Sequence, residues 1–408
     1  MKQQRTFPSA VVSPRAELSI RAGHPWVYDT EVRSLAEPCE NGGLVDVLSG
    51  KGAYLGTAFV SKSSKIRLRI LSRDANERFS DAFWERRVRY ALDYRRAVMG
   101  PDFSCCRLIF GEADGLPGLT VDRYGDLLVS EVLSVGMERV KDTVYRALCR
   151  QLAGSGAPVR GLYERSESPI RLLEGLPQTK GWYPLEGLPL PADALTEITE
   201  NGIRYAVDLE NGQKTGFFLD QKYNRRAVAG LAAGRRVLDC FTHTGSFALN
   251  AAKGGAAHVT AVDVSRSAVE MARANARRNG LEDKMSFLCA DVFELLPALC
   301  EQRAEYDLVI LDPPAFTKSR RTVSAAGRGY KEINYRAMKL LPRGGYLATC
   351  SCSHFMEDAA FRKMLLSAAR DAGVSLRLIE ARRQAPDHPV LLQVPETDYL
   401  KFYLFQLV

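Results

Sequence analysis

The sequence predicts an α/β protein whose C-terminal half is a doubly wound parallel sheet, preceded by a small β-barrel and an α+β domain. From Arg236 onward, short apolar runs with strand character alternate with helical stretches, which is typical of a parallel sheet covered by helices on both faces. An aspartate stands at or just after the end of each of the first four runs. Ligands bind at the carboxyl ends of the strands in such sheets, so we expect a functional site there.

The first segment, residues 1–73, is predicted to form the barrel. Its closely spaced strand-like runs are Ala10–Val12, Gly43–Leu48, Ala53–Val60 and Ile66–Leu71. In the last run, Lys65, Arg67 and Arg69 alternate with apolar residues, which predicts a cationic strip over a packed core. This strip is either a surface that contacts phosphates or an ordinary solvated strand face.

The second segment, residues 74–193, is predicted to be an α+β domain. Residues 83–96 have apolar positions at helical spacing, with arginines that could contact phosphates between them. These arginines are Arg86, Arg87, Arg89, Arg95 and Arg96. The proline-rich residues 184–191 are a plausible linker, because proline and glycine interrupt both helices and strands, and the last domain then covers residues 194–408.

Composition limits the class of protein. The 408 residues exceed what one hydrophobic core usually organises, and the net charge of +8 favours a polyanionic partner. No apolar run is long enough for a membrane helix and the N-terminus lacks the apolar core of a signal peptide, so we expect a cytoplasmic protein. The nine cysteines include no Cys-x-x-Cys pair, so we expect free thiols and no metal site.

The strand-end acids predict how an adenosyl group is held. Asp263 is placed to accept hydrogen bonds from the ribose hydroxyls, and Asp291 to meet the adenine amino group. The alternative for any one of them is a helix N-cap. The turn after Asp239 carries a single glycine, Gly245, whereas a dinucleotide pyrophosphate needs a glycine-rich helix start; this favours S-adenosylmethionine over NAD.

The loop Leu311–Phe316, with the sequence Leu-Asp-Pro-Pro-Ala-Phe, is a sharper signal. Two prolines stiffen the backbone after the acidic end of the fourth run. Such a loop can present Asp312 to a planar base, with Phe316 available for stacking. The alternative is a simple proline-rich turn.

Three motifs carry a resemblance to a known family. They are Gly212–Arg225 (GQKTGFFLDQKYNR), Asp312–Phe316 (DPPAF) and Thr349–Ser353 (TCSCS). In this order they resemble those of the bacterial ribosomal-RNA cytosine-5 methyltransferases that act on the large subunit. Gly23–Tyr28 also resembles the entry of that family's N-terminal PUA domain, an RNA-binding pseudobarrel. Gly111–Leu119 and Tyr163–Ser166 resemble its central domain, so the resemblance covers nearly the whole chain.

The resemblance implies a Rossmann-like class I methyltransferase domain with S-adenosylmethionine as cofactor, ribosomal RNA with a single-stranded or flipped base as substrate, and a homodimer. Gln221 resembles a glutamine that related enzymes place near the methionine moiety, although its neighbours Lys214, Arg225 and Arg226 could instead touch RNA phosphate. The residues expected to bind the cofactor are Gln221, Phe241, Gly245, Ser246, Asp263, Asp291 and Asp312.

The resemblance also implies a covalent mechanism. Carbon 5 of cytosine is a poor nucleophile, so these enzymes add a thiolate to carbon 6. Cys350 matches the Thr-Cys-Ser element and is the expected nucleophile, while Asp312 would hydrogen-bond ring atom N3. Cys352 could remove the carbon-5 proton, be the nucleophile itself, or be inert. The other candidates for that base are His354, Glu396 and Asp398.

Two rival functions remain open at this stage. The Asp-Pro-Pro loop could serve methylation of uridine carbon 5 or of a guanine or adenine nitrogen, and nitrogen methylation needs no thiol. The chain could also be an RNA-binding ribosome assembly factor that keeps a cofactor fold without turnover.

Overall fold

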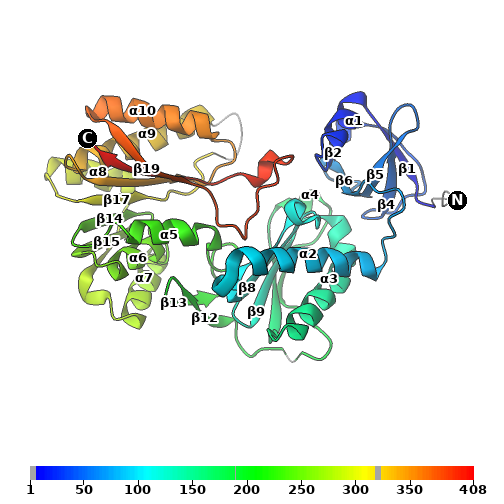
Figure 1. The fold of residues 1–408 in the computed structure, drawn as a ribbon, viewed down its shortest axis with the longest axis horizontal. Helices are drawn as coiled ribbons and strands as arrows, with labels where there is room; N and C mark the ends of the chain where they lie inside the picture. Colours follow the sequence, from blue (N-terminus) through cyan, green and yellow to red (C-terminus); the bar gives the residue numbers. More distant parts are fainter. Residues whose placement is uncertain (1–5, 189, 318–322) are drawn as a thin grey trace. The chain divides into compact units, whose positions relative to one another are not determined.

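The computed structural model describes residues 6–188, 190–317 and 323–408, so residue 189 of the predicted linker lies outside the described residues. The chain forms two compact units, each built from three stretches (Figure 1). Unit 1 comprises Met1–Ile198, Val207–Leu219 and Pro386–Thr397. Unit 2 comprises Thr199–Ala206, Asp220–Ala385 and Asp398–Val408. No helix in the described ranges is both long and apolar enough to cross a membrane.

The N-terminal part of unit 1 contains a six-stranded sheet in the order β2-β6-β5-β4-β1-β3. Its strands are β1 (Ser9–Val12), β2 (Trp26–Tyr28), β3 (Val32–Leu35), β4 (Leu44–Leu48), β5 (Tyr54–Val60) and β6 (Ile66–Ser72). The four runs expected from the sequence correspond to β1, β4, β5 and β6. The short β2 and β3 and helix α1 (Pro14–Arg21) were not predicted; α1 begins after Ser13, whose Oγ accepts a hydrogen bond from the amide of Ala16.

The predicted cationic strip on β6 is wrong for Arg69, the last of its three residues. Arg69 is buried and forms ion pairs with Glu112 at 3.2 Å and Glu174 at 2.9 Å. Arg67 turns back to donate a 2.7 Å hydrogen bond to the carbonyl of Ser61. Strand alternation placed these side chains on one face, but it could not show that carboxylates from later segments cover that face.

The second sheet of unit 1 has the order β11-β10-β9-β8-β7. Its strands are β7 (Cys105–Phe110), β8 (Leu119–Tyr124), β9 (Leu127–Val132), β10 (Gly161–Ser166) and β11 (Thr179–Trp182). The helices of this part are α2 (Asp81–Met99), α3 (Val135–Gly154) and α4 (Ile170–Leu173). The expectation that Arg95 of α2 contacts phosphate is wrong, because this side chain is fully buried against Asp114 at 2.5 Å.

The two later stretches of unit 1 are anchored to this second sheet by buried polar contacts. Asp387 accepts the backbone amide of Arg107 at 2.8 Å, and its own carbonyl accepts from Arg95 at 2.9 Å. Thr215 donates to Asp122 at 2.5 Å. A buried polar group destabilises the fold unless it has a hydrogen-bond partner. Each of the two later stretches supplies such partners to buried groups of the earlier residues.

The hairpin of β12 (Leu195–Glu200) and β13 (Ile203–Asp208) carries the chain onward to the seven-stranded sheet of unit 2. The order of this sheet is β16-β15-β14-β17-β18-β20-β19. Its strands are β14 (Arg236–Cys240), β15 (His258–Asp263), β16 (Met285–Cys289), β17 (Leu308–Leu311), β18 (Tyr346–Ser351), β19 (Leu376–Arg382) and β20 (Lys401–Leu407). The first five are parallel to one another, and β20, which lies between β18 and β19, runs antiparallel to both of these neighbours.

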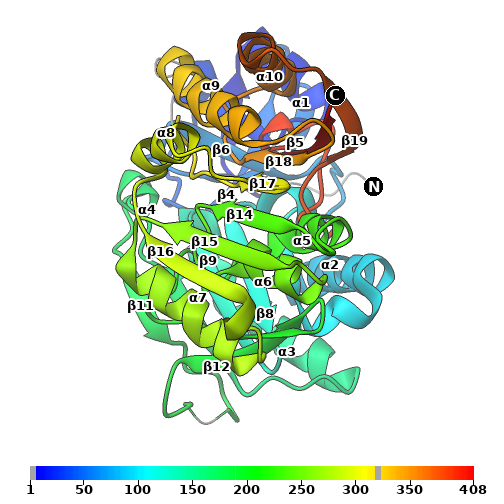
Figure 2. The same ribbon diagram turned by 90° about the vertical axis from the view of Figure 1, so that its left-hand side faces the viewer.

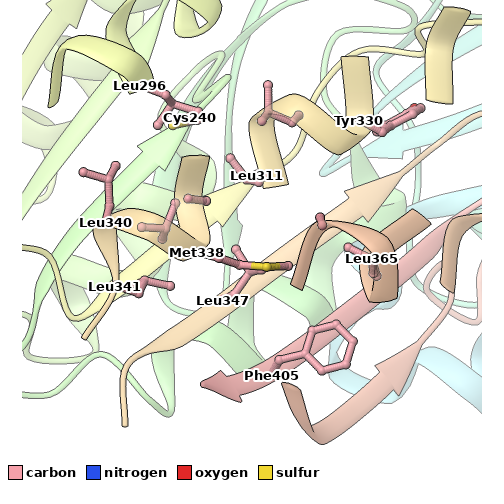
Figure 3. Close-up of a cluster of buried hydrophobic side chains, with 14 of the residues drawn as sticks. Cys240, Leu296, Leu311, Tyr330, Met338, Leu340, Leu341, Leu347, Leu365 and Phe405 are labelled. Carbon is pink, nitrogen blue, oxygen red and sulfur yellow. The ribbon is translucent and has the colours of Figure 1, made fainter. Parts of the chain in front are cut away.

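Helices cover both faces of this sheet (Figure 2). They are α5 (Lys222–Ala229), α6 (Ser246–Lys253) and α7 (Arg266–Arg278) on one face and α8 (Val292–Glu301), α9 (Val323–Leu340) and α10 (Asp358–Ala372) on the other. Between the second group and the strands lies a buried apolar cluster that includes Leu311, Tyr330 and Leu347 (Figure 3). The predicted α/β class with a doubly wound sheet is therefore confirmed, and the rigid core fixes where each strand ends.

Candidate active site

The candidate site lies in unit 2, where β14, β15, β17 and β18 end. β14 has β15 on one side and β17 on the other, so the order of strands reverses at this point. Chain connections leave in opposite directions from such a switch point, which opens a crevice at the carboxyl ends of the strands.

The turn between β14 and α6 is tightly constrained. Phe241, His243 and Gly245 all have positive φ, of 65°, 49° and 81°. A Cβ on Gly245 would lie 2.9 Å from the Cβ of Ala272, so only glycine fits without a shift of α7. Ser246, the first residue of α6, is buried. The turn therefore presents backbone, rather than side chains, toward the crevice.

Asp263 ends β15, as expected, and holds this turn. Its Oδ2 accepts the amide of His243 at 2.9 Å, and its Oδ1 accepts the amide of Ser265 at 2.9 Å. Each carboxylate oxygen retains a second lone pair. The side chain can thus fix the loop and still accept hydrogen bonds from a diol.

Asp239 differs from the expected strand-end acid because β14 continues to Cys240. Asp239 is fully buried, and its Oδ2 accepts hydrogen bonds from Thr242 Oγ1 at 2.6 Å and from the amide of Ala248 at 2.9 Å. Burial raises the pKa of this carboxyl to about 7. Its Oδ1 and the hydroxyl of Thr244 have no hydrogen-bond partner among the described residues. These buried polar atoms, with the glycine turn, suit a ligand that carries polar groups.

Asp291 is the N-cap of α8, where its Oδ1 accepts the amide of Phe293 at 2.8 Å. The capping role that the sequence left as an alternative is thus present. The side chain is exposed beside the end of β16, so its Oδ2 remains available to a ligand.

Asp312 follows β17 directly and lies in a hydrogen-bonded chain of amides. Gln221 Nε2 donates to Asp312 Oδ1 at 2.9 Å, and Asn224 Nδ2 donates to Gln221 Oε1 at 2.6 Å. Burial, and secondly the negative charge of Asp220, raise the pKa of Asp312 to about 6. Gln221, which was expected beside the cofactor, orients the Asp312 carboxylate in this structure.

Cys350 lies in β18, fully buried, and its thiol lies next to the side chains of Asp312 and Gln221. Burial and the neighbouring carboxylate raise the pKa of this thiol well above its usual value. The structure therefore brings together Cys350, Asp312 and Gln221. A buried thiol of this kind reacts only if a nearby base takes its proton, and Asp312 is the carboxyl group next to it.

Cys352 lies just beyond the end of β18 and is half-buried. Its Sγ is 3.9 Å from the carbonyl oxygen of Pro313 in the Asp-Pro-Pro loop. The flanking serines hold the segment: Ser351 Oγ donates to the Tyr330 hydroxyl at 3.1 Å, and Ser353 Oγ to the carbonyl of Thr317 at 2.9 Å. Both cysteines of the Thr-Cys-Ser-Cys-Ser motif thus border the loop that carries Asp312.

The other expected participants are differently placed. The ring of Phe316 packs on Tyr330, with ring centroids 4.6 Å apart, and so is engaged within the apolar cluster rather than free to stack on a base. His354 does not cap α10, whose N-cap residue is Glu357. Asp398 pairs with Arg383 at 3.0 Å, and Glu396 pairs with His24 inside unit 1.

Two residues of the site were not predicted. Asp220 accepts a 2.6 Å hydrogen bond from the Tyr399 hydroxyl at Oδ2, and its buried Oδ1 has no partner in the described chain. Lys401, at the start of β20, is a buried cation. Asp220 could have been noticed as the neighbour of Gln221. Nothing in the sequence indicates that Lys401 belongs to the site, because it lies in an ordinary strand-like run.

Comparisons with known proteins agree with this geometry. A family profile described as S-adenosylmethionine-dependent methyltransferase matches residues 181–406, and a PUA-like domain profile matches residues 10–73. The chain is 40% identical over 397 residues to the "Ribosomal RNA large subunit methyltransferase I" of Klebsiella pneumoniae strain 342, covering 97% of both chains. It is 40% identical over 400 residues to the protein of the same name from Erwinia tasmaniensis, covering 98% of this chain and 99% of the relative.

Two solved structures have the same fold. One, described as a SAM-dependent methyltransferase from Streptococcus mutans, aligns with a TM-score of 0.81 at 24% identity, over 98% of this chain and 99% of that one. The other, a methyltransferase complexed with SAH, aligns with a TM-score of 0.81 at 23% identity and the same coverage. At these identities the likeness shows the fold alone.

Proposed function

The chain belongs to the S-adenosylmethionine-dependent methyltransferases, and we propose that it methylates carbon 5 of a cytidine in large-subunit ribosomal RNA through a covalent cysteine adduct. The cofactor, S-adenosylmethionine, supplies an electrophilic methyl group. The turn at Gly245, the free oxygen of Asp239 and the available lone pairs of Asp263 are the groups of this chain that fit it. Support for the RNA substrate comes from the names of the relatives and from the PUA-like domain.

One observation carries the choice of carbon 5: the thiol of Cys350 lies next to the carboxyl of Asp312. Transfer of the thiol proton to Asp312 creates two useful groups at once. The thiolate can add to carbon 6 of the pyrimidine, and the protonated Asp312 can donate a hydrogen bond to N3 as negative charge develops there. Methylation of a ring nitrogen uses neither group.

The same pair favours cytosine over uracil. N3 of cytosine accepts a hydrogen bond, whereas N3 of uracil carries its own proton, so a protonated Asp312 matches cytosine. The unpartnered Oδ1 of Asp220 is a buried acceptor, and the charge of Asp220 acts on Asp312. It fits the 4-amino group of cytosine, while the 4-oxo group of uracil would be repelled.

A base in a structured RNA reaches such a buried thiol only after it leaves its stack, so the substrate base is single-stranded or flipped. The net charge of +8 favours binding to the phosphate backbone. The homodimer implied by the resemblance and the three-domain boundaries at residues 73 and 193 stay predictions.

The test is replacement of the nucleophile. With tritiated S-adenosylmethionine and ribosomal RNA from a strain that lacks the gene, Cys350→Ala should lower methyl transfer by at least about a thousandfold. Cys300→Ala is the control, because Cys300 is a partly buried thiol that donates to a backbone carbonyl outside the site, that of Arg336. Mass-spectrometric mapping of the product should find 5-methylcytidine.

Undiminished transfer by Cys350→Ala, or a methyl group on a nitrogen, would eliminate the covalent mechanism. Binding of S-adenosylmethionine by the wild type without any transfer would favour the assembly-factor alternative.

A further inference from the structure

Lys401 is a buried lysine in the candidate active site whose ammonium group faces backbone carbonyls. Only 2% of its surface is exposed. Its Nζ donates to the carbonyl of Ser353 at 2.7 Å and to the carbonyl of Tyr399 at 2.9 Å. A buried cation costs several kcal/mol of desolvation in general, so a lysine at this position calls for an explanation beyond packing.

The nearby carboxylates do not neutralise Lys401 by direct pairing. Asp358 accepts a 2.6 Å hydrogen bond from the Tyr403 hydroxyl, and Asp398 pairs with Arg383. The charged and titratable groups that act on Lys401 are Asp398, Arg383, Cys352 and Asp358. Of these, Cys352 is the one with a reactive side chain.

The backbone geometry connects Lys401 to Cys352. Lys401 is paired with Ser351 in the ladder between β18 and β20, and its ammonium reaches past the end of β18 to the carbonyl of Ser353. Lys401 therefore contacts the residue before Cys352 and the residue after it. On its other side, the thiol faces the carbonyl of Pro313. Cys352 thus lies between two residues that Lys401 contacts and borders the loop that would hold the target base, and the Lys401 ammonium and the Cys352 thiol interact electrostatically.

We propose that Lys401 is a positioning residue that holds Cys352 as a thiolate beside the Asp-Pro-Pro loop, so that Cys352 removes the carbon-5 proton and releases the methylated product. This role rests on the proposed function. A thiol next to a lysine ionises more readily, and a buried lysine without a carboxylate partner is well suited to stabilise that thiolate.

The release step balances as follows. The Cys352 thiolate forms an S–H bond with the proton on carbon 5, and the electrons of the broken C–H bond re-form the double bond between carbons 5 and 6. As this double bond forms, the bond between carbon 6 and Cys350 Sγ breaks, and its electron pair leaves with Cys350 as a thiolate. The proton on Cys352 passes to solvent before the next turnover.

The experiment separates release from methyl transfer. Lys401→Met and Cys352→Ala are incubated with ribosomal RNA and tritiated cofactor, and the products are run on a denaturing gel. Both variants should accumulate an RNA–protein adduct that contains the tritiated methyl group, while multiple-turnover rates fall about a hundredfold or more. Lys363→Met, a change of an exposed lysine on α10, should form no excess adduct and keep the wild-type rate.

A second measurement covers the case in which Lys401→Met folds poorly. Iodoacetamide labelling of the native wild-type and variant proteins, followed by peptide mass spectrometry, reports thiolate formation at Cys352 directly. Lys401→Met should slow labelling of Cys352 about tenfold relative to Cys300 in the same sample. Burial lowers the pKa of Lys401 to about 8, so in the wild type this labelling advantage should fade above pH 8.

The proposal for Lys401 is overturned if Cys352 labels equally fast in both proteins, or if Cys352→Ala accumulates the adduct and Lys401→Met does not. Failure of the proposed function looks different, because Cys350→Ala would then still transfer methyl groups and no variant would form an adduct.

Discussion

Gln221 donates a 2.9 Å hydrogen bond to Asp312, and its orientation is fixed because its own carbonyl oxygen accepts from Asn224. The amide group therefore presents its NH2 group to the carboxylate. This arrangement stabilises the ionised form of Asp312 and opposes the effect of burial on its pKa. Gln221 thus tunes the group that is proposed to accept the thiol proton.

Gln221→Glu should raise the pKa of Asp312 further, because it replaces a donor by a second carboxylate. We expect the pH profile to move upward by roughly one unit, so that kcat/KM falls about tenfold at pH 5 and about twofold at pH 7. Gln302→Glu, an exposed change after α8, is the control. An unmoved profile in Gln221→Glu would show that Gln221 does not tune Asp312.

The wild-type enzyme should gain activity as the pH rises through about 6. Asp312 must be ionised to accept the proton of Cys350, and its pKa is raised to about 6. Below this pH the Asp312 carboxyl is already protonated and cannot accept the thiol proton. We therefore expect kcat/KM to fall about tenfold for each pH unit below 6. Measurement of kcat/KM from pH 5 to 8 checks this, and a flat profile over that range would contradict it.

Asp239 should make the protein less stable as the pH rises. Its pKa is about 7 in the folded state against 3.8 in the reference state, so between these values the folded state binds more protons than the unfolded state. The free energy of unfolding therefore decreases with rising pH across this window. Asp239→Asn removes the titration, and its unfolding free energy should fall less from pH 5 to 8 than the wild-type value, by roughly 2–3 kcal/mol. Urea unfolding at both pH values measures the difference, and equal pH dependence would refute the assignment.

Gly245→Ala should weaken cofactor binding. The substitution adds a Cβ at a φ of 81° and 2.9 Å from Ala272, so the turn must move. We expect a loss of about 1–3 kcal/mol in stability and at least about a tenfold rise in the Kd for S-adenosylmethionine by calorimetry. Gly280→Ala is the control, since its φ is 65° but no atom lies within 4 Å of the added Cβ. Similar Kd values for both variants would show that the contact with Ala272 is unimportant.

Arg95→Met should destabilise unit 1 without any direct effect on the chemistry. Removal of this buried cation leaves Asp114 without its 2.5 Å partner, a change that typically costs about 3–5 kcal/mol. Arg96→Met, which breaks a 2.9 Å surface pair with Asp93, should cost less than about 1 kcal/mol. Thermal unfolding of both variants tests this. Equal losses of unfolding free energy would mean that the buried Arg95 pair contributes no more to stability than the surface pair of Arg96.

The parallel strands of unit 2 could be predicted because apolar runs alternate with helical stretches, and the first four of these runs end near an acid. The acids themselves were harder to interpret. Asp239 is not the last residue of its strand but the last but one, and neighbouring residues of a strand point to opposite faces. Its side chain is therefore buried and hydrogen-bonds with Thr242. Contacts between distant segments were not predictable at all: nothing in the local sequence places Glu174 against Arg69.

The same limit applies to the candidate site. Cys350 and Asp312 could be chosen from motifs at strand ends, because strand order alone brings those ends together. Lys401 belongs to a strand that runs antiparallel to β18, so its approach to Cys352 depends on a register that the sequence does not encode locally.

The interleaved path of the chain has a consequence for synthesis on the ribosome. Unit 1 includes Pro386–Thr397, and Asp387 in this stretch supplies partners to Arg95 and Arg107. An N-terminal fragment that emerges first therefore lacks the acceptors that Asp387 supplies to the Arg95 side chain and to the Arg107 backbone amide until nearly the whole polypeptide has been made. Truncation before residue 386 should release a protein that is prone to aggregate, and neither unit can be expressed alone by a single cut of the gene.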